Sequence, residues 1–144
     1  PATYRFADEV TLRLGLNLKI YSPLVTSARR TALWGGVPAL DDPHHAAFTQ
    51  EVKLEPFERA LREAAPDLWL TGIRGEQTEF RRSLGVISNG PFGTLRVAPI
   101  FAWSAVDLED YLYEHGLPDN DDYVDPTKGR ENRECGLQNM GSGI

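Results

Sequence analysis

The sequence predicts an α/β fold in which helices flank a parallel sheet, with a polar tail at the carboxyl-terminal end. Two observations indicate this fold. Apolar residues recur at helical spacing in several separate stretches, and short apolar runs of strand length lie between them. The expected order of elements is α-β-α-α-β-α-β-α, which is typical of a layered α/β architecture.

The first helix is expected to end at Gly15. Phe6, Val10 and Leu14 recur at four-residue spacing, and a glycine directly after such a stripe is typical of a left-handed C-cap. Residues 16–21 then alternate between apolar and polar side chains, which predicts a strand with one buried face.

A short second helix is expected over 26–34. Glycines and prolines then mark a loop that reaches two adjacent histidines, His44 and His45. Neighbouring histidines can bind a metal, but no third ligand stands at a recognisable spacing. We therefore expect no metal site.

A third helix is expected to start at Pro56, because proline suits the first helical turn, and to stop before Pro66. The run 68–73 follows. It is expected to be the central strand, because a parallel strand covered on both faces is apolar throughout. A helix and a turn-rich segment at 88–91 then precede the next strand, 95–100.

The last helix is expected to begin at a capping box formed by Ser104 and Asp107, and Gly116 and Pro118 close it. Apolar periodicity disappears after this point. The sequence therefore predicts one α/β core over residues 1–118 and a mobile tail over 119–144.

Composition limits the function classes. The chain has 144 residues, of which 41% are hydrophobic and 25% charged, which suits one soluble core. We expect a cytoplasmic protein without membrane contact, because no stretch is long and apolar enough to span a bilayer and no leader is recognisable. The formal net charge of −6 argues against nucleic-acid binding, which depends on neutralising phosphates.

Cys135 is the only cysteine in the sequence. It can neither form an internal disulfide nor complete a four-cysteine metal site, so its expected use is as a nucleophile or a redox centre with one partner. Arg130 and Arg133 favour its thiolate, whereas Glu134 opposes it. A buried, inert cysteine is the alternative, but the polar, glycine-flanked surroundings favour reactivity.

A second candidate region follows the strand at 68–73, where ligands bind in open parallel sheets. Gly72 and Gly75 would let the backbone approach a ligand, Arg74 offers a donor fork for phosphate or sulfate oxygens, and Gln77 adds a neutral donor. An ordinary turn with Arg74 in solvent remains the alternative.

Lys53, just before the third helix, is a further candidate cation for anion binding. A solvated loop lysine is the alternative there. Two basic islands in an acidic chain, one around Arg74 and one around Arg130, suggest a single anion pocket, although solvated surface charge is the commoner explanation for either alone.

Several segments carry a resemblance to a known family. Residues 71–78, TGIRGEQT, resemble the G-I-R-R-E-Q-S segment of phosphoadenylyl-sulfate (PAPS) reductases, and residues 133–137, RECGL, resemble their terminal R-E-C-G-L-H signature. Residues 1–23, 52–61 and 97–103 resemble three further segments. The resemblance implies a partial adenine-nucleotide-hydrolase-like, Rossmann-like fold.

The resemblance also implies a reaction, the thioredoxin-dependent reduction of PAPS to sulfite and adenosine 3′,5′-bisphosphate in sulfate assimilation and cysteine biosynthesis. Cys135 would be the catalytic nucleophile and form a thiosulfonate, which thioredoxin or glutaredoxin resolves. With one cysteine, the chain resembles the class without an iron–sulfur cluster, and no bound cofactor is expected. By similarity, the substrate would be bound by Lys53, Arg74, Gln77, Arg130 and Arg133, with Gly72 and Glu134 in supporting roles.

Three departures from the family pattern keep an alternative open. No Ser/Gly-rich phosphate loop with its following L-D-T-G strand is found, Gln138 replaces the family histidine, and Gly75 replaces a second arginine. The alternative is a non-catalytic or split module of the same fold, completed by a homo-oligomer or another chain. A reductase-like protein of DNA sulfur modification is the third hypothesis, which the acidic charge disfavours. The choice between PAPS and the unphosphorylated sulfonucleotide stays open.

Overall fold

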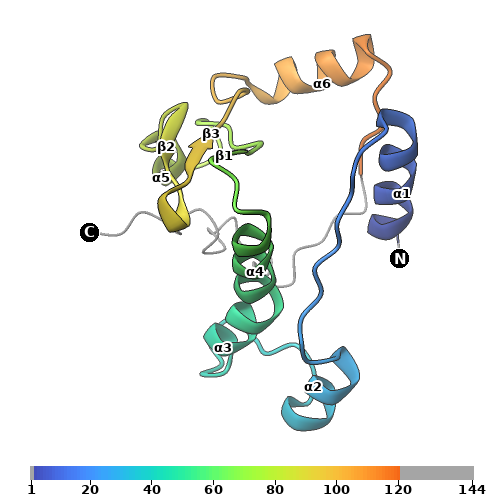
Figure 1. The fold of residues 1–144 in the computed structure, drawn as a ribbon, viewed down its shortest axis with the longest axis vertical. Coiled ribbons are helices and arrows are strands. Elements are labelled where there is room, and N and C mark those ends of the chain that lie inside the picture. Colours follow the sequence, from blue (N-terminus) through green and yellow to red (C-terminus); the bar gives the residue numbers. More distant parts are fainter. Residues whose placement is uncertain (1, 121–144) are drawn as a thin grey trace. The chain divides into compact units, whose positions relative to one another are not determined.

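The computed structural model describes residues 2–120, whose helices and strands are labelled in Figure 1. These residues fall into two units. Residues 2–18 and 66–120 belong to the first unit, and residues 19–65 belong to the second. Within residues 2–120, no helix is long and apolar enough to cross a membrane.

The first unit contains a three-stranded sheet in the order β1-β3-β2, formed by Leu68–Leu70, Leu95–Val97 and Ile87–Asn89. β1 pairs with β3 in parallel, and β2 pairs with β3 antiparallel. The predicted α/β class is confirmed, with a mixed rather than wholly parallel sheet. The prediction that 68–73 is the central strand is wrong for the described residues, since β3 holds that position.

The helices of the first unit end and begin where the sequence predicted. α1, Ala2–Leu14, ends at Gly15, which has φ 63°, and the Leu16 amide donates to the Thr11 carbonyl at 3.0 Å. This bond, which spans six residues, is one of the two hydrogen bonds of a Schellman C-cap motif. α6, Ala105–Glu114, begins at the predicted capping box of Ser104 and Asp107.

Two short elements complete this unit. The helix expected between the strands is the single turn α5, Glu79–Arg82, whose N-cap is Thr78. The segment 88–91, predicted to be a turn, contributes Ser88 and Asn89 to β2, and the 3-10 turn η2, Pro91–Gly93, follows. The prediction missed β2 because three residues are too few to show an alternating pattern.

The strand predicted over 16–21 is absent. The three apolar side chains that suggested it are largely exposed, with 47% of Leu16, 44% of Leu18 and 58% of Ile20 accessible to solvent. A strand needs a neighbouring strand to bond its backbone groups, and none of the described residues supplies one here. Residues 16–21 therefore form no strand, although their side chains alternate between apolar and polar.

The second unit consists of α2 and a long helical run. α2, Ser27–Trp34, is capped by Thr26 and Gly35 and confirms the second predicted helix. The run is continuous through α3, His45–Thr49, the π-helix η1, Gln50–Leu54, and α4, Glu55–Ala64. It starts at His45, well before Pro56, so the loop predicted there ends one residue earlier at His44.

Small apolar cores hold these units. Within the described part of the chain, Ile73 and Ala98 are buried apolar side chains of the first unit, and Phe48 and Leu61 are buried apolar side chains of the second. α4 ends at Ala65, whose φ of 42° is left-handed, and Pro66 prevents the helix from continuing.

Candidate functional site

A tightly held loop follows β1 in the first unit. The Thr71 amide donates to the Val97 carbonyl at 2.9 Å, which extends the pairing with β3, and Ile73 is 3% exposed. The Gly75 amide then donates to the Phe101 carbonyl at 2.8 Å. The loop after the parallel strand is thus anchored at both ends, at the sheet edge where the sequence predicted ligand binding.

The two glycines of this loop have different surroundings. A Cβ atom on Gly72 would meet no atom within 4 Å, so the space beside that backbone position is open, and its role toward a ligand stays a prediction. A Cβ on Gly75 would lie 2.9 Å from Cζ of the Phe101 ring. Gly75 therefore makes room for an aromatic ring rather than for a ligand, which corrects the expectation for that residue.

Arg74 is paired within the loop and does not extend freely into solvent. Its Nη1 donates to Oε1 of Glu76 at 2.8 Å, and only 13% of its side chain is exposed, against 44% for Glu76. The predicted alternative of a solvated Arg74 does not describe this geometry. An anion that binds Arg74 must compete with the Glu76 carboxylate, a partner the sequence analysis overlooked although it stands two residues away.

Gln77 stabilises the loop through its amide oxygen. That oxygen accepts from the backbone amide of Arg74 at 3.3 Å and from Nη1 of Arg81. The predicted role, a neutral donor to the substrate, would fall to the amide nitrogen. Gln77 therefore links the backbone of Arg74 to the side chain of Arg81 on α5.

Arg96 is a buried cation that the sequence analysis did not single out. It lies at the middle of β3 with 1% of its surface exposed, and its Nε donates to Oγ of Ser88 at 3.0 Å. Burial lowers the pKa of the Arg96 guanidinium, because removal from water disfavours the charged form. A charge inside the apolar run 95–100 was the signal that could have found it.

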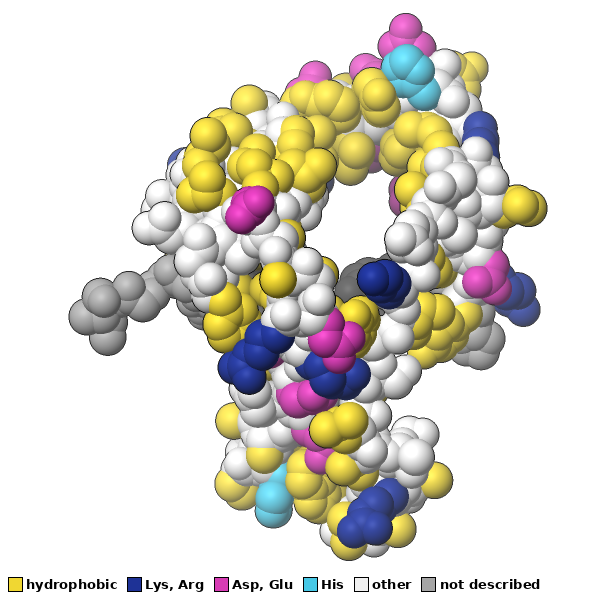
Figure 2. Space-filling view, viewed as in Figure 1, with side chains coloured by type: hydrophobic (Ala, Val, Ile, Leu, Met, Phe, Trp, Pro, Cys, Tyr) yellow, Lys and Arg dark blue, Asp and Glu magenta, His cyan; other side chains and the backbone are white. Residues whose placement is uncertain are grey.

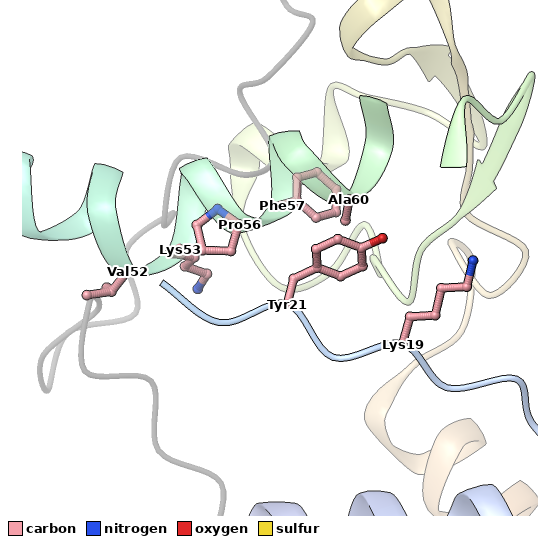
Figure 3. A pocket seen from close by; sticks show the side chains of 7 residues that line it. All are labelled: Lys19, Tyr21, Val52, Lys53, Pro56, Phe57 and Ala60. Carbon is pink, nitrogen blue, oxygen red and sulfur yellow. The ribbon is translucent and has the colours of Figure 1, made fainter. Parts of the chain in front are cut away.

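The second unit contains a cavity of about 340 Å³ around Lys53 (Figure 3). Lys53 is on the π-helical segment η1, a type of helix that is frequent at functional sites. Figure 3 shows the Tyr21 side chain between Lys53 and Lys19 in this view. The lining combines these two cations with mostly apolar side chains, namely Val52, Pro56, Phe57 and Ala60.

Tyr21 is fixed by polar contacts at the edge of this cavity. Its hydroxyl donates to Oε2 of Glu63 at 2.8 Å, and the guanidinium carbon of Arg59 lies 5.5 Å from the centre of its ring. The hydrogen bond to the Glu63 carboxylate, followed by desolvation, raises the pKa of Tyr21 above its usual value of 10.0. Tyr21 therefore stays neutral at ordinary pH.

Arg59 connects α4 to the segment that precedes α2. It donates from Nε to Oε1 of Glu55 at 2.7 Å and from Nη2 to the Ser22 carbonyl at 2.7 Å. The hydrogen bond from Arg59 lowers the pKa of the Glu55 carboxyl. These bonds hold the segment that carries Lys19 and Tyr21 against α4, so the cavity is a built feature of this unit. The sequence analysis missed Lys19, Tyr21 and Arg59, whose positions are set by folding.

The two histidines form no metal centre with other described residues. Nδ1 of His44 lies 2.8 Å from Oδ1 of Asp42, and Nδ1 of His45 lies 3.2 Å from the Pro38 carbonyl. Hydrogen bonds from His44, first from its backbone amide, lower the pKa of Asp42. Over residues 2–120, no group of three or more potential ligands is close enough together to hold a metal ion.

Four predicted site residues, Arg130, Arg133, Glu134 and Cys135, lie outside the described residues, as does Gln138. The structure places Arg74, Gln77 and Gly72 together in the first unit and Lys53 in the second. Their roles toward a substrate remain predictions.

Comparison with known proteins gives a consistent result. A family model described as "Phosphoadenosine phosphosulfate reductase domain" matches residues 1–124. A phosphoadenosine 5′-phosphosulfate reductase of Synechococcus is 38% identical over 119 residues, which covers 81% of this chain and 50% of that protein. One from Vibrio cholerae is 38% identical over 125 residues, covering 82% and 46%, respectively.

A solved structure shares the fold. The crystal structure of a phosphoadenylyl-sulfate (PAPS) reductase from Candida auris, in a phosphate complex, superposes with a TM-score of 0.68 at 26% identity. The match covers 83% of this chain and 57% of that one. The present chain thus spans about half the length of the curated relatives it matches.

Proposed function

The chain belongs to the phosphoadenosine phosphosulfate reductase domain family, and on this premise we propose that it carries the catalytic cysteine of a thioredoxin-dependent PAPS reductase. The products would be sulfite and adenosine 3′,5′-bisphosphate. The family match over residues 1–124 carries the family assignment, and the segment 133–137, RECGL, which lies beyond that match, carries the role proposed for Cys135. The anchored loop with a largely buried Arg74 at the end of a parallel strand supports it, because such loops suit anion binding.

The proposed first step is attack of the Cys135 thiolate on the sulfur atom of the sulfate group. A bond forms between Sγ and that sulfur, while the bond from sulfur to the bridging phosphate oxygen breaks. Adenosine 3′,5′-bisphosphate leaves with the electron pair, and Cys135 becomes a thiosulfonate.

The second step returns the cysteine to its thiol form. One thiolate of reduced thioredoxin or glutaredoxin attacks Sγ of Cys135 and expels sulfite, and the second thiol of the donor resolves the mixed disulfide. The donor dithiol becomes a disulfide and so supplies the electrons that reduce the sulfate sulfur. No resident cofactor or cluster enters these steps.

Negative charge develops on the leaving phosphate in the first step, and cations stabilise it. By similarity, this role falls to Lys53, Arg74, Arg130 and Arg133, with Gln77 as a neutral donor. Nη1 of Arg74 donates to Glu76, so a substrate oxygen that binds this nitrogen would compete with the carboxylate. In the second unit, Lys19 joins Lys53 as a cation of the same cavity.

The alternative proposal is a module of this fold that needs a complementing polypeptide before it can bind nucleotide. One observation favours keeping it, namely that the chain spans about half the length of its relatives. In that case Cys135 would react only in the completed assembly.

The test is intact-mass spectrometry of the 144-residue chain after incubation with PAPS and no reductant. We expect a sulfonate adduct that maps to Cys135, that is absent from Cys135→Ser and that reduced thioredoxin removes as sulfite. An adduct or sulfite release that persists in Cys135→Ser would refute the proposed nucleophile. A folded wild-type chain that forms no adduct alone, but does so with a complementing polypeptide, would establish the alternative.

A further inference from the structure

Arg30 is a buried cation of the second unit that the proposed reaction does not use. It lies on α2, with 9% of its surface exposed. Its Nε donates to Oε1 of Glu51 at 2.6 Å, and its Nη2 donates to the Val25 carbonyl at 3.1 Å. Its guanidinium carbon also lies 5.6 Å from the centre of the Phe48 ring. A buried charge needs such partners, and together they hold this side chain in one position.

The charges on the surface of the helical run are held differently. Figure 2 shows Lys, Arg, Asp and Glu side chains over the region where Figure 1 places α4. On α4, Nη2 of Arg62 and Oε2 of Glu58 are 3.9 Å apart, and 66% of the Arg62 side chain is exposed. Water screens such a pair, so it fixes its side chains weakly. The Arg30–Glu51 pair is shorter, and only 10% and 25% of its side chains are exposed.

Glu51 and Lys53 face opposite sides of the π-helical segment η1. Residues two apart in a helix are separated by about 200° of rotation at 3.6 residues per turn, and the wider π-turn keeps them on roughly opposite faces. The contacts agree with this geometry, because Glu51 is bonded to α2 whereas Lys53 lines the cavity. The same short segment is therefore held on one side and presents a cation on the other.

Phe48 reinforces the contact with α2. It precedes Glu51 by three residues, so the two side chains lie on the same face of the run. The Phe48 ring is 2% exposed and faces the Arg30 guanidinium. The π-helix interrupts the α-helical pattern between α3 and α4, and this contact fixes the segment from the α2 side.

We propose that Arg30 is a positioning residue for Lys53. By holding Glu51, it fixes the rotation of η1 so that Lys53 faces the cavity. Arg30 acts only through Glu51 and does not touch the substrate. The inference rests on the proposed function, in which Lys53 binds the anionic part of a sulfonucleotide, and it adds the residue that directs the lysine there.

The test compares two lysines of the 144-residue chain by trace acetylation with acetic anhydride and peptide mass mapping. Lys53 and Lys19 line the same cavity, but Lys19 is not on the helical run, so the ratio of the Lys53 rate to the Lys19 rate is measured. Glu51→Ala removes the oxygen that accepts from Arg30, whereas Glu51→Gln keeps one, and both remove the same charge. Arg62→Met, at the exposed pair on α4, is the matched control for Arg30→Met.

We expect Glu51→Ala and Arg30→Met to raise this ratio at least about threefold, because Lys53 then turns out of the cavity and reaction rates depend on the placement of the reacting group. Glu51→Gln and Arg62→Met should leave it within about twofold of the wild type. An equal ratio in Glu51→Ala and Glu51→Gln would overturn the inference. Equal acceleration of both lysines would also overturn it, because the whole unit would then have loosened.

Circular dichroism verifies that the variants fold, and if Arg30→Met does not fold, the two Glu51 variants decide the question. Neither a nucleotide nor a reaction at Cys135 enters this test. A negative result therefore leaves the proposed reaction unaffected, and absence of the Cys135 adduct leaves the positioning result unaffected.

Discussion

Replacing Gly75 with alanine tests how closely the loop after β1 packs on Phe101. The added Cβ would lie 2.9 Å from Cζ, 3.1 Å from Cε1 and 3.4 Å from Cε2 of the ring. The shortest of these distances is one that real Cβ atoms do not adopt, so the ring or the loop must shift. The Gly75 amide is bonded to the Phe101 carbonyl at 2.8 Å, which limits how far the two can separate.

The expected loss of stability follows from two opposing effects. Overpacking of this kind costs about 1–3 kcal/mol. Alanine also restricts the unfolded chain, which favours folding by about 0.4–1 kcal/mol, and the φ angle of Gly75 is not left-handed, so this gain applies. The net effect ranges from about zero to a destabilisation of about 2.6 kcal/mol, with a midpoint of about 1.3 kcal/mol.

Urea unfolding followed by circular dichroism measures this difference, and Gly72→Ala is the matched control. Gly72 lies three residues away in the same loop, with no atom within 4 Å of the added Cβ and no left-handed φ. It should therefore gain about 0.4–1 kcal/mol. Equal or greater stability of Gly75→Ala relative to Gly72→Ala would refute the packing argument.

A rescue variant separates the ring contact from other effects of the substitution. Phe101→Leu shortens the side chain that faces Gly75, so the double variant should lose less stability than the sum of the single variants. Additive losses would show that the clash lies elsewhere. The result also bears on function, because the family resemblance places an arginine at position 75, and any residue with a Cβ there must first move Phe101.

Three further predictions concern other parts of the structure. Glu76→Gln removes the carboxylate that competes for Arg74, a charge worth up to about 1 kcal/mol, so calorimetry should show about two- to fivefold stronger binding of adenosine 3′,5′-bisphosphate. Unchanged affinity in both Glu76→Gln and Arg74→Ala would contradict a substrate role for Arg74. Ala65→Gly should stabilise the chain by about 0.5–1 kcal/mol. Glycine removes the strain of the left-handed φ of 42°, and this gain exceeds the cost of the greater freedom of glycine in the unfolded chain. A lower midpoint in urea unfolding would contradict this. Glu63→Gln should return the pKa of Tyr21 toward 10.0 in an ultraviolet titration, with Tyr21→Phe identifying the signal. Because the folded pKa is raised, Tyr21 contributes stability below pH 10.0, and this stability is lost as the pH rises through the pKa of the folded state. If Glu63→Gln left the pKa of Tyr21 unchanged, the shift would have another cause.

Local signals predicted two helix ends of this chain. Gly15 and the Ser104–Asp107 pair act on backbone groups a few residues away, so the sequence contains all the information needed to place those ends. The start of the long helical run at His45 was not predicted, because the only signal used there was Pro56. Strands depend on distant partners. The alternation over 16–21 is real, but no strand of the described residues pairs with it, and the central position of β3 follows from β2, which is too short to recognise.

The candidate site shows the same limit. The sequence identified Arg74 and Gln77, because their residue types suit anion binding and they follow a strand. It could not show that Glu76 forms an ion pair with Arg74 or that Gln77 accepts a hydrogen bond from Arg81, since both interactions depend on side-chain geometry. Lys53 was identified as a cation, whereas the cavity around it also needs Lys19 and Tyr21, whose segment is bonded to α4 through Arg59 and Glu63.

The π-helix Gln50–Leu54 gives the long helical run a place where its length can change. A π-turn closes with bonds from residue i to i+5 rather than i+4, so it holds one residue more than an α-turn. Deletion of one residue from this segment could convert it to α-helix while Phe48 on one side and Leu61 on the other keep their buried positions. Lys53 would then turn relative to Tyr21. A change of one residue in length at this segment would therefore alter the direction of the lysine without refolding the unit.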